Sequence, residues 1–168
     1  MANIVTSEDF KGTIQLDTTR TDTVTQLDET ISEFEPQILS SLFGLSAVKK
    51  IYDSLELDIN PLEDFLKGGY YVNLDGKDVY FEGLVKTLAN FLYFYYIIDS
   101  ESVNTSVGDV TLNALNGTAV LNRTKLINTF NKAIDLSVNL FDYINANKEL
   151  FNNDIETNEY EKLNFIGL

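Results

Sequence analysis

The chain has 168 residues, 44% of them hydrophobic, which is enough to bury one core and typical of a single domain. It contains neither histidine nor cysteine, which excludes disulfides, thiol chemistry and any histidine-based catalysis or metal binding. Its net charge of -14 repels the phosphates of nucleic acids and anionic membranes, so proteins are the expected partners.

Residues 1–22 are predicted to form an extended N-terminal arm. Ile14 and Leu16 alternate with polar residues, which is typical of a short strand. We expect no signal peptide, because no basic segment followed by an apolar run occurs at the start. Phe10 and Ile14 are candidates for contact with a neighbouring molecule, and the alternative is a partly ordered terminus.

Residues 23–147 are predicted to form one helical domain. Its first helix is expected to begin near Thr23 or Thr25, the candidate N-caps. Pro36 removes a backbone donor and predicts a kink or break, and Gly44 is the predicted helix end. A second, shorter helix follows. The inward-facing residues of these helices are expected to be Leu27, Ile31, Phe34, Ile38, Leu42, Val48, Ile51, Tyr52 and Leu55.

A β-hairpin is predicted over residues 70–81. Two aromatic and β-branched runs flank Asp75-Gly76, a dipeptide typical of tight hairpin turns. We expect the hairpin either to contact another molecule or to cover the base of the next helix. The candidate contact residues are Tyr70, Tyr71, Asp75 and Lys77.

The same stretch partly matches a calcium-binding loop. Asn73, Asp75 and Glu82 occupy three of its ligand positions. Tyr71 stands at the first position, where an aspartate is normally required, and the residues before it are strand-like instead of helical. We therefore prefer a plain hairpin turn and expect no bound metal and no cofactor.

The central helix of the domain is predicted between Val79 and Ser100. Phe91 to Ile98 are eight consecutive apolar or aromatic residues, far fewer than the ~20 that a membrane helix needs. A helix that is apolar nearly all round is surrounded by other protein. Its many tyrosines predict more contact surface than one small domain offers.

Residues 101–121 are predicted to be a long polar loop, and loops of this length in compact domains are usually functional or disordered. Asn122 is the expected N-cap of a final long helix, and residues 148–168 form an acidic tail with an apolar end. The expected fold is a mainly α bundle of about four helices with a small β-hairpin and the extended N-terminal arm. The candidate contact residues of the loop, for which the alternative is a mobile connection, are Val103, Ser106, Val107, Gly108, Leu112 and Leu115.

No motif indicates catalysis. The glycine patterns of P-loops, Rossmann folds and serine hydrolases are absent. Carboxylate neighbours such as Glu63 with Asp64 are expected by chance among 26 acidic residues, and solvated surface explains them better than a catalytic pair. We therefore expect no enzymatic activity.

The order of short motifs resembles the small head-to-tail connector proteins of tailed bacteriophages, specifically the adaptor-like ring proteins of crAss-like and other Bacteroidetes phages. The similarity spans most of the chain up to residue 147. The motifs are Phe10-Lys11-Gly12, Leu42-Phe43-Gly44-Leu45, Gly68-Gly69, Gly76-Lys77, Phe81-x-Gly83-Leu84, Ser106-x-Gly108, Phe130-Asn131 and Tyr143-Ile144.

This resemblance implies a structural virion protein of the phage neck, assembled in the cytoplasm of the bacterial host. Such adaptors form a cyclic homo-oligomer, with twelve copies expected here. They bind the portal protein, extend the DNA channel and present a surface to other neck or tail proteins, and they have no catalytic residues. DNA passes through without specific binding, and the acidity of this chain suits such a channel wall.

Two readings from other classes remain open. The chain is alternatively an acidic binding module that recruits a basic partner through its Asp and Glu residues. A carboxylate-dependent hydrolase is the third reading, which requires a carboxyl group with a raised pKa inside a cleft.

Overall fold

The computed structural model describes residues 3–56, 62–105, 108–111, 118–151, 155, 157–158 and 160–163. The chain is mainly α-helical with a small β-hairpin, as predicted, and it has a second hairpin that was not predicted. The helices are α1 (Thr21–Glu56), α2 (Glu63–Lys67), α3 (Gly83–Glu101) and α4 (Thr118–Ala146). The strands are β1 (Gly69–Val72), β2 (Asp78–Phe81), β3 (Ser102–Thr105) and β4 (Gly108–Thr111).

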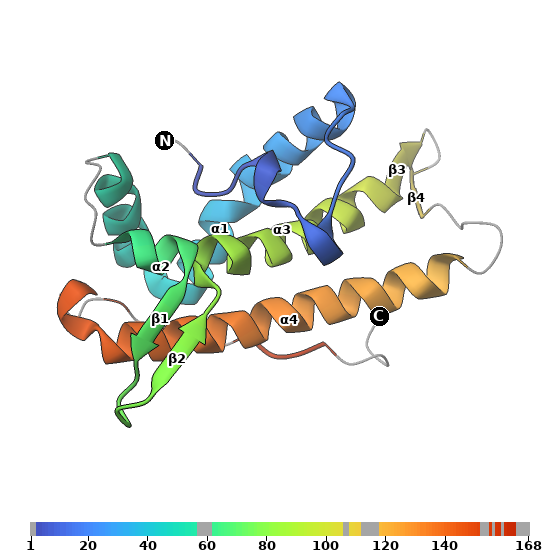
Figure 1. Ribbon diagram of the computed structural model, residues 1–168. Coiled ribbons are helices and arrows are strands. Elements are labelled where there is room, and N and C mark those ends of the chain that lie inside the picture. Colours follow the sequence, from blue (N-terminus) through green and yellow to red (C-terminus); the bar gives the residue numbers. More distant parts are fainter. Residues whose placement is uncertain are drawn as a thin grey trace.

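Helix α3 lies at the centre of the bundle, between α1 and α4 (Figure 1). Leu84, Leu88 and Leu92 are fully buried, and most of the other apolar side chains of α3 are buried or half-buried. The chain's own elements therefore cover this helix. The expectation that its aromatic residues need contact surface from neighbouring copies is wrong, because they are already packed in the core.

Helix α1 is interrupted at Gly44, whose φ of 76° and ψ of 157° lie outside the helical region. The predicted break at Gly44 is confirmed, whereas the break predicted at Pro36 is wrong. Pro36 lies inside the helix. Pro36 has no amide hydrogen to donate to the carbonyl of Ser32, one turn earlier in the helix. Both residues are exposed, so water can satisfy that carbonyl.

The N-terminal segment is folded onto the helices instead of extending from them. It forms 3-10 helical turns at Ser7–Asp9 and Gly12–Ile14, and the second turn includes Ile14, where a short strand or extended arm was predicted. These turns contact α3, and the first also contacts α1 (Figure 1). Phe10 and Ile14 are buried in the chain's own core and are not exposed for contact with a neighbour, which corrects the expectation for both residues.

Two antiparallel hairpins are present. The predicted hairpin is confirmed as β1–β2, with Tyr70 opposite Tyr80 and Tyr71 opposite Val79. The stretch predicted as a structureless loop contains a second hairpin, β3–β4, with Val103 opposite Val110. Its strands have only four residues each, which is too short for a clear alternation in the sequence.

Helix α4 begins at Thr118, ahead of the predicted N-cap Asn122. Its apolar residues at helical spacing are buried except for Val138, which is exposed; the buried ones are Ile127, Phe130, Ile134, Phe141 and Ile144. The described part of the tail folds back onto the bundle: Tyr160 packs its ring against Phe91 and Phe130. The Asn131 side chain exchanges two hydrogen bonds with the backbone of Leu163, of 2.8 and 3.0 Å.

Candidate interaction surface

The β1–β2 hairpin has an inner face that packs on α4. Because side chains alternate along a strand, Tyr71 and Phe81 share this face. The Phe81 ring stacks on Tyr143 with centroids 4.2 Å apart, and the Tyr71 ring meets Tyr143 edge-on at 5.2 Å. Tyr71 was predicted to contact another molecule, but its side chain is buried against α4, which corrects that expectation.

The opposite side of the hairpin exposes apolar residues. Tyr70 and Tyr80 are 81% and 55% exposed, Val72 is 59% exposed, and Leu74 at the turn is 80% exposed. The two tyrosine rings lie 5.2 Å apart across the strands. We call these four residues the hairpin outer face. They are half of the large hydrophobic residues that are exposed in the described part of the chain.

Hydrogen bonds of Asn73 fix the turn of this hairpin. Its side-chain oxygen accepts bonds from the amides of Asp75 and Lys77, at 3.1 and 3.0 Å. Its own amide donates to the Lys77 carbonyl at 2.9 Å. Asp75 and Lys77, two of the candidate contact residues, are exposed beside Leu74. The bonds made by Asn73 are those of a plain hairpin turn.

Close backbone packing fixes the orientation of the hairpin on the bundle. Gly68 ends α2 with a φ of 82°, and Gly83 begins α3 with a φ of 80°. A Cβ atom on Gly68 would collide with the backbone of Phe81, and one on Gly83 would collide with the backbone of Gly68. Only glycine allows this approach, so the hairpin projects from the helices at a fixed angle (Figure 1).

A groove of about 480 Å³ lies beside the hairpin base. One wall comes from the N-terminal segment, through Ile4, Asp9 and Lys11. The remaining lining includes Tyr80, which belongs to the hairpin outer face, and residues of α2 and α3. The groove contains three of the chain's 12 basic residues, although the chain carries a net charge of -14. These residues are Lys11, Lys67 and Lys86.

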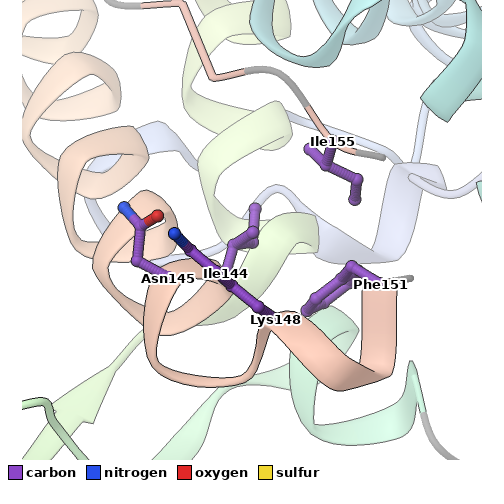
Figure 2. A pocket seen from close by; sticks show the side chains of 5 residues that line it. All are labelled: Ile144, Asn145, Lys148, Phe151 and Ile155. Atoms are coloured by element: carbon purple, nitrogen blue, oxygen red, sulfur yellow. The ribbon is translucent and has the colours of Figure 1, made fainter. Parts of the chain in front are cut away.

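A second pocket, of about 160 Å³, lies at the end of α4. Figure 2 shows Ile144, Phe151 and Ile155 around it, with Asn145 and Lys148 alongside. Pockets for small-molecule ligands usually have volumes of ~300–1,000 Å³. This pocket is smaller, and none of the described residues that line it carries a carboxylate or a hydroxyl group.

The described part of the chain contains no cluster of three or more acidic residues close enough to hold a metal ion. No helix among the same residues is long and apolar enough to cross a membrane. Of the loop candidates, Val103 and Gly108 lie in β3 and β4. Ser106, Val107, Leu112 and Leu115 lie outside the described residues.

Sequence reasoning missed Glu35, a fully buried carboxylate on α1. A signal for it was present in the sequence. Glu35 lies four residues after Ile31 and three before Ile38, so it falls on the apolar face of the helix. A charged residue in that position needs hydrogen-bond partners, and residues at the chain start provide them.

The chain was also compared with known proteins. No protein-family model, curated protein or solved structure matches it.

Proposed function

We propose that this chain is a structural connector protein of a bacteriophage neck, and that the hairpin outer face is the surface through which one copy docks on the next. The main support is the exposure of four apolar side chains on one hairpin, those of Tyr70, Val72, Leu74 and Tyr80. Clustered exposed apolar side chains on a fixed element are typical of interaction sites. Tyrosine is also enriched in such sites.

Contacts that close a ring join two different patches of the same chain. A candidate for the opposing patch is a mostly apolar groove of about 380 Å³ beside Leu45, at the kink of α1. Leu45 is exposed there, with Pro36 and Val48 in the lining. The hairpin of one copy inserts its outer face at this groove of the neighbour, and repetition of the contact closes a ring of twelve copies.

The charges of the chain support the same role. The groove at the hairpin base carries three lysines beside the carboxylates of Asp9 and Glu82, so it is less acidic than the chain as a whole and repels an acidic neighbouring copy least. A ring with this acidity repels the DNA backbone, so DNA passes through it without specific binding. The portal protein and the next neck or tail protein contact the two ends of the ring in the virion.

Sedimentation velocity of the purified protein, alone and mixed with the portal protein of the same phage, tests this function. We expect a ring-sized species in at least one of the two samples. A protein that stays monomeric alone and also fails to bind the portal contradicts the proposal.

The net charge also favours a second candidate, an acidic module that recruits a basic partner. The two functions differ in their response to salt. Binding by the acidic surface weakens steeply as the salt concentration rises, because its charges become screened. Docking by the hairpin outer face depends on apolar burial and persists at high salt.

A further inference from the structure

Glu35 ties the start of the chain to α1. Its two carboxylate oxygens accept hydrogen bonds from the Ile4 amide, at 2.9 and 3.1 Å, and one of them also accepts from the Val5 amide at 2.9 Å. The Tyr52 hydroxyl donates to the other oxygen at 2.8 Å. The carboxylate is fully buried, so these donors replace the water that it lost on folding.

The donors around Glu35 are neutral groups. Burial raises the pKa of Glu35, and the hydrogen bonds from Ile4, Val5 and Tyr52 oppose that effect. Burial and the neighbouring carboxylate raise the pKa of Tyr52, which keeps its hydroxyl protonated as a donor. Both protonation states of Glu35 can hold the chain start, because a protonated carboxyl group still has one oxygen that accepts from the two amides.

The segment that Glu35 holds is also a wall of the groove beside the hairpin. We call residues 3–14 the N-terminal strap. Ile4, whose amide binds Glu35, lines the groove together with Asp9 and Lys11. The groove wall and the buried carboxylate are therefore linked through the backbone of a single residue.

The rest of the strap has its own local constraints. The Thr6 amide and hydroxyl donate to the Asp9 carboxylate at 2.8 and 3.0 Å, which closes the first 3-10 turn. Phe10 and Ile14 are buried on either side of the exposed Lys11. Residues 15–20, which connect the strap to α1, are mostly exposed. Val5 is also buried, so the attachment of the strap depends on three buried side chains and on the bonds to Glu35.

We propose that Glu35 is a positioning residue for the interaction surface: by accepting the amides of Ile4 and Val5, it holds the N-terminal strap as one wall of the groove beside Tyr80. What docks at that groove rests on the proposed function, whereas the attachment of the strap does not. An apolar side chain in place of Glu35 would fill the same volume, but it would leave the amides of Ile4 and Val5 and the hydroxyl of Tyr52 without an acceptor.

Hydrogen exchange in Glu35→Ala, Glu35→Gln and Glu33→Ala tests this role. Glu35→Ala removes the acceptor, so we expect exchange of the strap amides to rise on the order of ten- to a hundredfold. Glu35→Gln keeps an oxygen for both amides and an NH₂ group for the Tyr52 oxygen, so its strap should exchange like the wild type. Glu33 is exposed on the same helix, and Glu33→Ala should change nothing.

Amides of α3 and α4 provide the internal reference. If Glu35→Ala leaves strap exchange unchanged, or raises exchange equally in α3 and α4, Glu35 does not position the strap and the proposal is overturned. Failure of Glu35→Gln to restore protection overturns it as well. If Glu35→Ala does not fold, a shortened chain that begins at Thr6 replaces it, because this chain lacks both amide donors and keeps Glu35. Unchanged hydrogen exchange over residues 7–14 in the shortened chain contradicts the proposal.

Self-association, measured in the same variants, separates the role of Glu35 from the proposed connector function. If the strap loosens in Glu35→Ala and self-association falls with it, both are supported. If the strap loosens but wild type and variant associate with neither another copy nor the portal, the role of Glu35 stands and the connector function fails.

Discussion

Helix α3 and the β1–β2 hairpin are both rich in aromatic residues. The chain buries most of those on α3, but on the hairpin it buries only the inner face. Tyr93, Phe94 and Tyr96 of α3 are buried in the core. Tyr70 and Tyr80 of the hairpin remain exposed, with each other as their ring partners. Aromatic content alone therefore does not mark an interface, because a central helix packs its aromatic side chains inside its own domain.

The two regions should therefore contribute to different free energies. Burying a large apolar side chain contributes roughly 1.5–3 kcal/mol. For α3 that contribution belongs to folding, because the water has already been displaced. For the hairpin outer face it is still available to association. Variants in the two regions should separate stability from assembly.

Phe91→Ala should have the largest effect on folding. Phe91 is buried on α3, with its ring 5.4 Å from Phe130 and 5.2 Å from Tyr160. Removing it leaves a cavity and should lower the free energy of unfolding by about 3–5 kcal/mol, measured by denaturant titration. Tyr70→Ala should cost less than ~1 kcal/mol, since it is an exposed substitution. Equal losses in the two variants would show that the hairpin outer face is packed like the core.

Gly68→Ala should have the next largest effect, because it strains the junction that orients the hairpin. A Cβ at Gly68 collides with the backbone of Phe81. Because this collision adds to the unfavourable φ, we expect the free energy of unfolding to fall by roughly 2–4 kcal/mol. Gly76→Ala is the matched control: its φ of 77° is similar, but no atom lies within 4 Å of the added Cβ. It should cost only about 1 kcal/mol, and an equal cost at the two positions would contradict the close approach.

Glu35→Gln should change how stability depends on pH. Burial raises the pKa of Glu35 above its ordinary value of 4.5, so the folded state binds more protons than the unfolded state between the two values. The stability contributed by this group is present below pH 4.5 and is lost as pH rises through the folded pKa. The difference in unfolding free energy between wild type and Glu35→Gln should therefore shift in favour of the variant as pH rises. A difference that is constant with pH would contradict the burial of a titrating carboxyl group.

Lys11→Ala should have the smallest effect. Lys11 lines the groove at the hairpin base but is exposed, so its attraction to an acidic neighbour is screened. We expect the dissociation constant of self-association to rise by only a few fold, about 0.2–1 kcal/mol, at low salt and not at high salt. Lys148→Ala, at an exposed position outside the groove, should leave association unchanged. A salt-independent loss in Lys11→Ala would indicate that the strap itself had moved.

The sequence predicted the parts of the fold whose signals are local. The apolar run of α3, the Asp75-Gly76 turn and the break at Gly44 each act through a few neighbouring residues, and the structure confirms all three. The local signals did not distinguish the two faces of the hairpin. Tyr70 and Tyr71 were both candidate contact residues, but Tyr70 is exposed and Tyr71 is buried. Which face of a hairpin is buried depends on a distant helix, here through Tyr143.

The parts that the sequence did not predict depend on contacts between distant residues. Phe10 and Ile14 pack into a core that only the assembled helices create. Glu35 accepts amides from about thirty residues away, so its role could not follow from helix spacing alone. Pro36 was expected to break α1, but the position is exposed and the helix continues through it.

The most direct test of the central claim compares the assembly of three proteins by sedimentation velocity, each alone and with the portal protein. One is the wild type, the second carries Tyr70→Asp with Leu74→Asp on the hairpin outer face, and the third carries Leu150→Asp at an exposed apolar position elsewhere. We expect the wild type and Leu150→Asp to assemble alike and the hairpin variant to remain monomeric while folded. Equal assembly of all three proteins would contradict the claim that the hairpin outer face joins the copies.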